Sequence, residues 1–260
     1  MGNPEFEHIK QRMDDMGICV IIPTYNNQKT VIGVVEEVMR YTRNIIVVND
    51  GSTDQTRQLL NDSALPVTCV HYEKNKGKGH ALKIGFLKAL DLGYTYAITI
   101  DSDGQHFPED LPLFVEAIKE YPQALIVGSR NLNSENMPGK NTFANKFSNF
   151  WFYIQTGQNL KDTQTGYRLY PLKKLRGLNL LTSRYEAELE LLVFASWHGV
   201  KLHPIFIQVY YPPKGERVSH FRPTADFLRI SLLNTVLCLG AIVYGLPLRI
   251  GRLFTQKNNR

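Results

Sequence analysis

Two aspartates, Asp101 and Asp103, stand two residues apart directly after a short apolar run. If that run is a strand, both carboxylates point to the same side of the backbone and can share one cation. Mg²⁺ and Mn²⁺ prefer oxygen ligands and often complete their coordination shell with substrate phosphates. The spacing therefore predicts a divalent metal site at Asp101, Asp103 and Gln105 that binds a diphosphate. The alternative is an Asx turn, with Asp110 or Glu109 helping to cap the next helix.

Two further polar segments follow apolar runs in the same way. Residues 49–54 contain Asp50, which can accept hydrogen bonds from a base or a ribose hydroxyl, and Gly51, which permits a tight turn. Residues 23–27 follow the first apolar run. For Asp50 the alternative is turn chemistry, together with the helix cap that Ser52 would supply.

A basic segment with two glycines, residues 76–81, precedes a helical pattern. Glycines at a helix N-terminus let a phosphate approach the backbone N–H groups, so Gly77 and Gly79, with Lys78 between them, mark a candidate phosphate site. The spacing of a Walker A loop is absent, and so is the Gly-x-Gly-x-x-Gly fingerprint. A solvated basic turn is the alternative.

Short β-rich runs alternate with helical patterns along the chain. The predicted strands are residues 18–23, 45–49, 67–71, 96–100, 125–128 and 202–211. The predicted helices are residues 29–41, 54–61, 81–90, 108–120, 143–154 and 184–197. This alternation predicts an α/β fold with a mostly parallel sheet and helices on both faces. Because open α/β sheets bind ligands at the carboxyl ends of their strands, we expect the three polar segments after strands to meet in one site.

The composition is that of a folded globular protein, with 43% hydrophobic and 21% charged residues among 260. The net charge of +6 fits three kinds of partner: nucleic acid, an anionic membrane surface or phosphorylated ligands. Four late cations, Arg249, Arg252, Lys257 and Arg260, follow an apolar stretch, which favours a membrane surface over nucleic acid. Three widely spaced cysteines indicate neither a disulfide framework nor a zinc site, and a cytosolic compartment is expected.

The apolar stretch, residues 230–248, carries no charge. Its length approaches the ~20 residues that cross a bilayer, although polar residues and glycines dilute its hydrophobicity. A helix in or on a membrane is favoured, and a buried C-terminal helix and an oligomer contact are the alternatives. The expected organisation is an N-terminal tail (1–16), a domain (17–223), and an apolar helix with a basic tail (224–260). Part of the N-terminal tail resembles a cloning remnant, and no signal peptide is expected in it.

Six motifs occur in the order of a known family. They are Ile22-Pro23-Thr24-Tyr25-Asn26, Val48-Asn49-Asp50-Gly51-Ser52-Thr53-Asp54, Gly77-Lys78-Gly79-His80-Ala81, Asp101-Ser102-Asp103-Gly104-Gln105-His106-Phe107-Pro108-Glu109, Gly128-Ser129-Arg130 and Asp162-Thr163-Gln164-Thr165-Gly166-Tyr167-Arg168. Over residues 18–223 the chain resembles family 2 glycosyltransferases, whose GT-A fold has a Rossmann-like sheet. Within that family it is most similar to the group of dolichyl-phosphate mannose synthases and polyprenyl-phosphate glycosyltransferases. Asn27 stands where the family often has glutamate, which leaves the base and the sugar open.

The resemblance implies a role for each matching residue. The nucleotide sugar would be bound by Pro23, Thr24, Tyr25, Asn27, Asp50, Ser52, Lys78, Asp101, Ser102 and Gln105, with Mg²⁺ or Mn²⁺ at Asp101, Asp103 and Gln105. The catalytic set would be Asp103, Arg130, Arg168 and Glu188, in which the two arginines meet phosphates through their bidentate fork. A late basic loop with Lys214, Arg217, Ser219 and His220 would close over the diphosphate.

The family's reaction is an in-line displacement that inverts the anomeric carbon. A polyprenyl-phosphate acceptor is already anionic, whereas a hydroxyl of a glycan or lipid would need a general base, for which Glu186 and Glu188 are candidates with Asp162 behind them. We expect transfer from a GDP-mannose or UDP-glucose type of donor to a polyprenyl phosphate at the cytoplasmic face of a membrane. Nucleic acid is not an expected partner, and a homo-oligomer is left open.

Two other classes of protein are disfavoured. A nucleotidyltransferase would have a glycine-rich phosphate loop after the first strand, and residues 24–29 have none. An inactive membrane scaffold would not need the paired aspartates.

Overall fold

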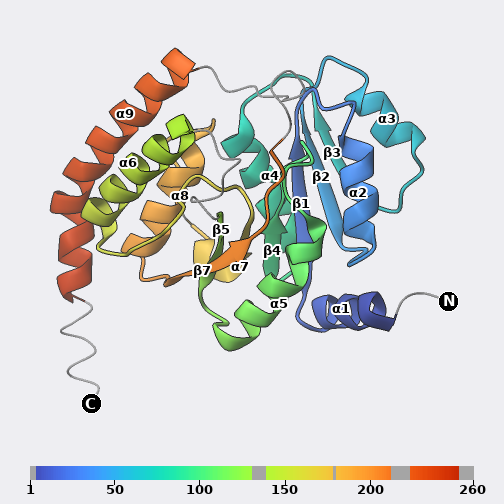
Figure 1. Cartoon of the computed structure of the whole chain (residues 1–260), viewed down its shortest axis with the longest axis horizontal. Coiled ribbons are helices and arrows are strands. Elements are labelled where there is room, and N and C mark those ends of the chain that lie inside the picture. Colours follow the sequence, from blue (N-terminus) through green and yellow to red (C-terminus); the bar gives the residue numbers. More distant parts are fainter. Residues whose placement is uncertain (1–3, 131–138, 178–179, 212–222, 252–260) are drawn as a thin grey trace.

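The computed structural model describes residues 4–130, 139–177, 180–211 and 223–251, with the backbone alone for 139–144 and 223–227. Within these residues, seven strands form one sheet in the order β3-β2-β1-β4-β6-β5-β7 (Figure 1). They are β1 (Ile18–Thr24), β2 (Ile45–Asp50), β3 (Thr68–Tyr72), β4 (Tyr96–Thr99), β5 (Leu125–Arg130), β6 (Arg168–Pro171) and β7 (Leu202–Ile207). The predicted α/β fold with a mostly parallel sheet is therefore confirmed.

Strand β6 was not predicted. It lies antiparallel between β4 and β5, with Arg168 opposite Thr99 on one side and opposite Val127 on the other. The remaining neighbours in the sheet are parallel. The strand has four residues, too few to show the alternation by which a strand is recognised.

The helices follow the predicted pattern with some shifts at their ends. They are α1 (Pro4–Asp15), α2 (Val31–Met39), α3 (Thr56–Asp62), α4 (Lys78–Asp91), the 3₁₀ turn η1 (Pro108–Asp110), α5 (Leu111–Glu120), α6 (Gly139–Thr156), α7 (Leu172–Leu175), α8 (Glu186–Trp197) and α9 (Pro223–Gly240). The last helix continues through a π-helical stretch, η2 (Ala241–Gly245), to Gly251. Residues 4–15, expected to be part of a tail, form a helix whose Ile9 and Met13 are buried in the core.

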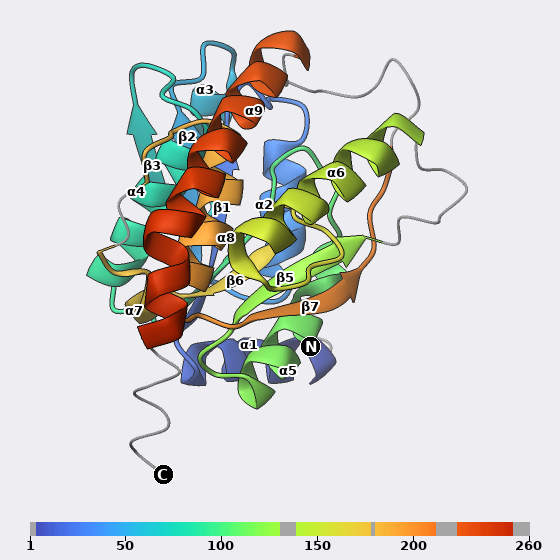
Figure 2. The same ribbon diagram turned by 90° about the vertical axis from the view of Figure 1, so that its left-hand side faces the viewer.

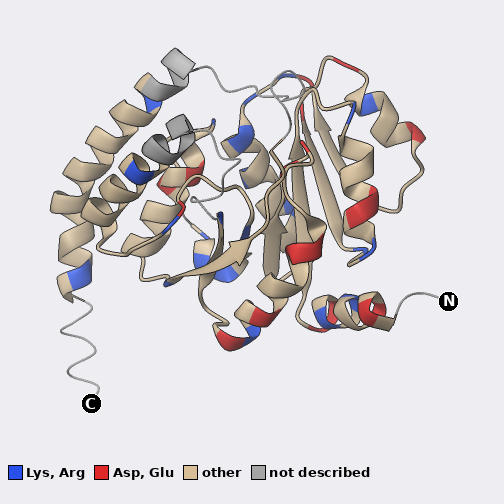
Figure 3. Ribbon diagram, viewed as in Figure 1, with Lys and Arg blue, Asp and Glu red and all other residues tan. Residues whose placement is uncertain are grey.

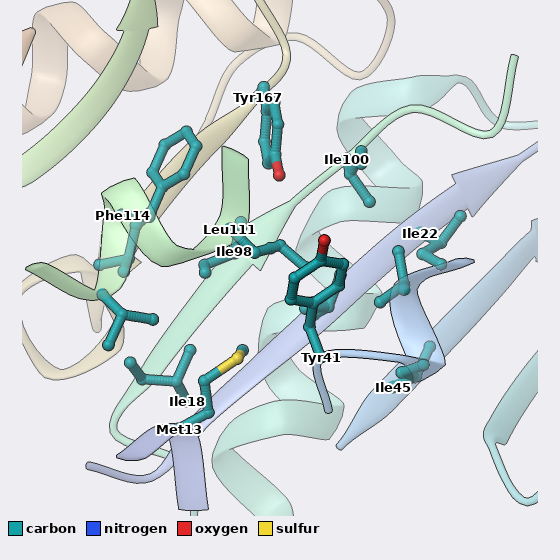
Figure 4. Packing of buried hydrophobic residues seen from close by; sticks show 14 of the residues in the cluster. Met13, Ile18, Ile22, Tyr41, Ile45, Ile98, Ile100, Leu111, Phe114 and Tyr167 are labelled. Carbon is teal, nitrogen blue, oxygen red and sulfur yellow. The ribbon is translucent and has the colours of Figure 1, made fainter. Parts of the chain in front are cut away.

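Both faces of the sheet are covered, and alternate residues of β1 divide between two cores. Ile18 and Ile22 pack with α1, α2 and α5 on one face (Figure 4), whereas Cys19 and Ile21 face α4 on the other. Successive side chains of a strand point to opposite faces, so a strand covered on both sides is apolar throughout. This is why β1 is fully buried while its carboxyl end emerges at an edge.

Helices α6 and α9 lie side by side as an outer layer over α8 (Figures 1 and 2). Leu233 and Leu237 of α9 are buried in a cluster with apolar residues of α8. Asn234 of α9 accepts a hydrogen bond from Gln155 of α6 at 3.0 Å. Outward, the pair carries an apolar face made of Phe147, Phe150, Tyr153, Ile154, Leu228, Leu232, Val236, Leu239, Ile242, Val243 and Leu246. Figure 3 shows few charges along these two helices.

Candidate active site

Three polar loops meet at the carboxyl ends of β2, β1 and β4, which are neighbours in the sheet. Asn27 donates a hydrogen bond to the Ser102 hydroxyl at 2.6 Å, and the Thr30 hydroxyl donates to the Ser102 carbonyl at 2.6 Å. The backbone N–H of Asn26 donates to the Ser52 hydroxyl at 3.0 Å. The loops after β1, β2 and β4 thus brace one another, as their positions after parallel strands predict.

Asp103 carries a negative charge that its surroundings disfavour. Burial, together with the neighbouring Asp101 carboxylate, raises the pKa of Asp103 to about 6. One carboxylate oxygen accepts the backbone N–H of Gln105 at 3.0 Å, which fixes its orientation. A carboxylate with a raised pKa beside a second carboxylate is suited to bind a cation, because the cation relieves both effects.

Asp101 lies in a cluster with Lys78 and Glu188. The Lys78 Nζ is 2.6 Å from Asp101 Oδ1 and 3.0 Å from Glu188 Oε2. Burial would raise the pKa of Asp101, but the Lys78 ammonium outweighs it and holds that pKa below its ordinary value. Gly166 lines the other side, since a Cβ there would lie 2.7 Å from the Lys78 Nζ and 2.8 Å from Asp101 Oδ2. Lys78 and Glu188 thus both lie in the predicted site.

The glycines at the start of α4 allow close packing against the segment before α8. A Cβ on Gly77 would lie 2.6 Å from the Ser183 carbonyl oxygen, and one on Gly79 would clash with the Ala187 side chain. The N–H of His80 donates to that same Ser183 oxygen at 2.9 Å. The segment before α8 therefore packs directly against the first turn of α4, and the phosphate contact at Gly77, Lys78 and Gly79 remains a prediction.

Asp50 uses both carboxylate oxygens within the protein. The N–H groups of Lys76 and Gly77 donate to them at 2.8 Å each, and the Asn75 amide donates at 2.9 Å. Asp50 is 3% exposed. Its contacts in this structure hold the segment before α4, so the predicted contact with a base or ribose remains a prediction.

Arg130 and Asp162 form a buried bidentate ion pair. Arg130 Nε and one terminal nitrogen donate to the two oxygens of Asp162 at 2.6 and 3.0 Å, and Asn145 donates to Asp162 at 2.6 Å. Burial would raise the pKa of Asp162, but Arg130 outweighs it and holds that pKa below its ordinary value. Arg130 lies at the carboxyl end of β5, where the sequence placed it, with its guanidinium directed to Asp162.

Arg168 and Glu190 are buried and bonded to backbone. Arg168 donates to the carbonyl oxygens of Glu188 and Thr163 at 2.8 and 3.0 Å and is fully buried. Glu190 accepts the N–H of Thr182 at 2.9 Å and is also fully buried. From the sequence, Glu190 is expected on a solvated face of its helix, and this expectation is wrong. In this geometry Arg168 fixes the start of α8, and with it Glu188.

His106 is a site residue that the sequence reasoning did not single out. Its Nδ1 lies 4.0 Å from Asp101 Oδ2 and, among the described residues, has no hydrogen-bond partner. Burial lowers the pKa of His106 to about 4, so the ring is neutral at pH 7. Its place in the Asp101–Glu109 motif was the available signal, but a histidine after a turn is too common to identify. The predicted loop residues Lys214, Arg217, Ser219 and His220 lie outside the described residues.

The donor set fits Mg²⁺ or Mn²⁺ with a diphosphate. Among the described residues, no group of three or more His, Cys, Asp and Glu side chains could by itself hold a metal ion. Two carboxylates, one of them with a raised pKa, suit a hard cation that takes its remaining ligands from substrate phosphates and water.

Asp162→Asn is expected to destabilise the fold by about 3 kcal/mol, because it leaves the buried Arg130 guanidinium without its counterion. Since the pKa of folded Asp162 is below the unfolded value of about 4, this stability is complete above that pH and is lost as the pH falls through the folded pKa. Thermal unfolding at pH 7 measures the loss. Glu73→Gln, which breaks the exposed pair with Arg57, is the control and should cost at most about 1 kcal/mol. Equal losses in the two variants would contradict the prediction.

Comparison of sequences identifies relatives of this chain. The UDP-N-acetylglucosamine–dolichyl-phosphate N-acetylglucosaminyltransferase of Methanococcus voltae is 31% identical over 76% of this chain and 88% of its own length. The undecaprenyl-phosphate mannosyltransferase of Micrococcus luteus is 30% identical over 64% of this chain and 70% of its own length.

A solved structure has the same fold. Glucosyl-3-phosphoglycerate synthase from Mycobacterium tuberculosis, in complex with Mn²⁺, UDP-glucose and phosphoglyceric acid, has a TM-score of 0.64 and 18% identity, covering 91% of this chain and 83% of that one. The model of Glycosyl transferase family 2 matches residues 19–176, which include the three loops and the paired aspartates. The chain therefore belongs to glycosyl transferase family 2 and is a glycosyltransferase with the GT-A fold.

Proposed function

We propose that this glycosyltransferase moves a sugar, with inversion, from a nucleotide-diphosphate sugar to a polyprenyl-phosphate carrier at a membrane surface. Relatives of similar length are named for transfer to dolichyl phosphate and undecaprenyl phosphate. The observation that carries the proposal is that two candidate general bases, Glu188 and Asp162, are held in ion pairs. A polyprenyl phosphate needs no base, because its oxygen is already anionic.

Two of the three predicted bases are held in ion pairs. Glu188 is bound to the Lys78 ammonium at 3.0 Å, and Asp162 is bound to Arg130 at 2.6 Å. The third, Glu186, is buried, and one of its carboxylate oxygens has no hydrogen-bond partner among the described residues. Residues two apart on an α-helix point about 200° apart, so Glu186 and Glu188 point to opposite sides of α8. A carboxylate held by an ammonium is a weaker proton acceptor, since protonation would break the ion pair.

The metal ion, when bound, supplies charge neutralisation on the leaving nucleoside diphosphate. Asp101 and Asp103 would hold it, and the buried setting strengthens every such charge interaction. Asn27 and Thr30 fix the loop that carries these aspartates through Ser102, so the loop is organised before the donor binds. An anionic acceptor oxygen approaching the anomeric carbon from the side away from the diphosphate would give inversion.

We further propose that α9 lies in the plane of the membrane. The helix from Leu228 to Gly251 is long and apolar enough to cross a bilayer, and its most apolar 18-residue window has a mean hydropathy of 1.8. One side of it is nevertheless docked on the domain, where Asn234 pairs with Gln155 and Gly240 and Gly245 pack against Trp197. A helix held along the domain in this way presents only its outer side to lipid, as an interfacial helix does.

The acceptor test compares a polyprenyl phosphate with the corresponding polyprenol in detergent, with Mn²⁺ and each of UDP-N-acetylglucosamine, UDP-glucose and GDP-mannose. We expect labelled sugar on the phosphate and none on the alcohol. Glu186→Gln should leave this transfer within about threefold of wild type, because no proton has to be removed. Transfer to the alcohol, lost in Glu186→Gln or Glu188→Gln, would instead support the hydroxyl-acceptor reaction.

A further inference from the structure

The Lys78 ammonium bridges two carboxylates that come from distant parts of the chain. It lies 2.6 Å from Asp101, after β4, and 3.0 Å from Glu188, on α8. The three side chains are only 17%, 25% and 10% exposed, so water screens their charges weakly. With Asp103 beside them, the group has one positive and three negative charges, a formal charge of −2 that one divalent cation would neutralise.

The backbone under Lys78 is held in place, while its side chain has two carboxylates within reach. The first turn of α4 is fixed to the segment before α8 by the His80 hydrogen bond to Ser183 and by the close contact of Gly79 with Ala187. Gly166 blocks one side of the ammonium. The ammonium can therefore leave Asp101 without losing Glu188, and such a move needs only side-chain rotation.

We propose that Lys78 is the internal counterion of the metal site, which pairs with Asp101 in the metal-free protein and remains on Glu188 when a divalent ion takes Asp101. Lys78 then competes with the metal for Asp101 and weakens its binding, and Glu188 favours metal binding because it retains the displaced ammonium. Both are positioning residues in this role. The inference rests on the proposed metal dependence, but its test measures metal binding alone.

Two variants at this cluster should shift Mn²⁺ affinity in opposite directions. Lys78→Met removes the competitor, so Mn²⁺ should bind on the order of tenfold more tightly, the size of effect that groups outside the first shell have on metal affinity. Glu188→Gln removes one of the two carboxylates that contact Lys78 and leaves Asp101 as the other. Mn²⁺ should then bind on the order of tenfold more weakly. Electron paramagnetic resonance of free Mn²⁺, titrated with full-length protein, gives both dissociation constants.

The matched control is Lys76→Met, which removes the same charge two residues earlier. Lys76 is exposed, and its Nζ lies over the Tyr72 ring at 5.9 Å. If general charge alone set the affinity, Lys76→Met and Lys78→Met would tighten binding alike. Competition at Asp101 predicts a change of less than about twofold for Lys76→Met, because an exposed charge is screened.

The outcomes separate the two proposals. The counterion role is overturned if wild type binds Mn²⁺ but Lys78→Met does not tighten the binding or Glu188→Gln does not weaken it. That result leaves the metal-dependent transfer standing. No Mn²⁺ binding by wild type up to millimolar concentrations, together with sugar transfer in excess chelator, overturns the metal dependence itself. Thermal unfolding of each sample shows that the variant is folded, and if Lys78→Met is not, Glu188→Gln still decides.

Discussion

Replacement of Asp103 by alanine is expected to lower sugar transfer by about 10³-fold, because the several kcal/mol that a metal ion contributes to transition-state charge stabilisation would be lost. The fold should survive. The raised pKa of Asp103, caused by burial and by Asp101, means that the ionised carboxylate disfavours folding at pH 7. The melting temperature in the absence of metal should therefore be unchanged or slightly higher. Initial rates with Mn²⁺ and thermal unfolding in chelator measure the two effects.

Asp91→Asn is the control for this experiment. Asp91 is an exposed carboxylate at the far end of α4, paired with Lys88 at 3.3 Å, and its loss should leave both rate and stability unchanged. Full activity of Asp103→Ala, or undiminished wild-type activity in excess chelator, would refute the metal mechanism. A collapse in stability would instead identify Asp103 as a structural residue of its loop.

The location of the site was predictable from the sequence, because it depends on topology. Asp50 and Asp101 each follow an apolar run, and parallel strands bring such positions to one edge. The brace between Asn27 and Ser102 is a consequence of that placement. The partners of the charged residues were not predictable in the same way. Lys78 and Glu188 are far apart in the sequence, and nothing in the spacing of either indicates that the start of α8 lies against the start of α4.

Arg168 illustrates why residue type alone can be insufficient. An arginine in a phosphate-binding family suggests a phosphate contact, yet this guanidinium donates to two backbone carbonyl oxygens. It does so because it begins β6, whose four residues were too few to be recognised, so the sequence could not show that this position is buried in a sheet. The first helix was missed for a different reason, since the segment was set aside as a tail.

The double substitution Leu239→Asp and Val243→Asp, on the outer side of α9, is expected to release the protein from anionic lipid vesicles. The native side chains are 62% and 78% exposed in the protein, so the substitutions disturb little packing. In lipid, each buried Leu or Val side chain contributes about 1.5–3 kcal/mol, and the loss of two should weaken vesicle binding by about 100-fold or more. Co-sedimentation with vesicles over a range of lipid concentrations measures the partition coefficient.

Leu113→Asp is the matched control. The Leu113 side chain is 45% exposed and lies on α5, away from α6 and α9 (Figure 1). This variant should leave vesicle binding unchanged, and unchanged binding of the double variant would refute the membrane role of the outer face.

An in-plane helix and a spanning helix differ in the side of the membrane on which residue 251 lies. A Cβ at Gly251 would meet no other atom within 4 Å, so Gly251→Cys can be introduced there without strain, with Cys69 and Cys238 replaced by alanine. An impermeant maleimide added on the side of the catalytic domain should label this cysteine if α9 lies in the plane. Labelling only from the opposite side would mean that α9 leaves α6 and α8 and crosses the bilayer. That would require the Asn234–Gln155 hydrogen bond to break and an amide to enter hydrocarbon, at a cost of several kcal/mol. The docked position makes the in-plane outcome the expected one.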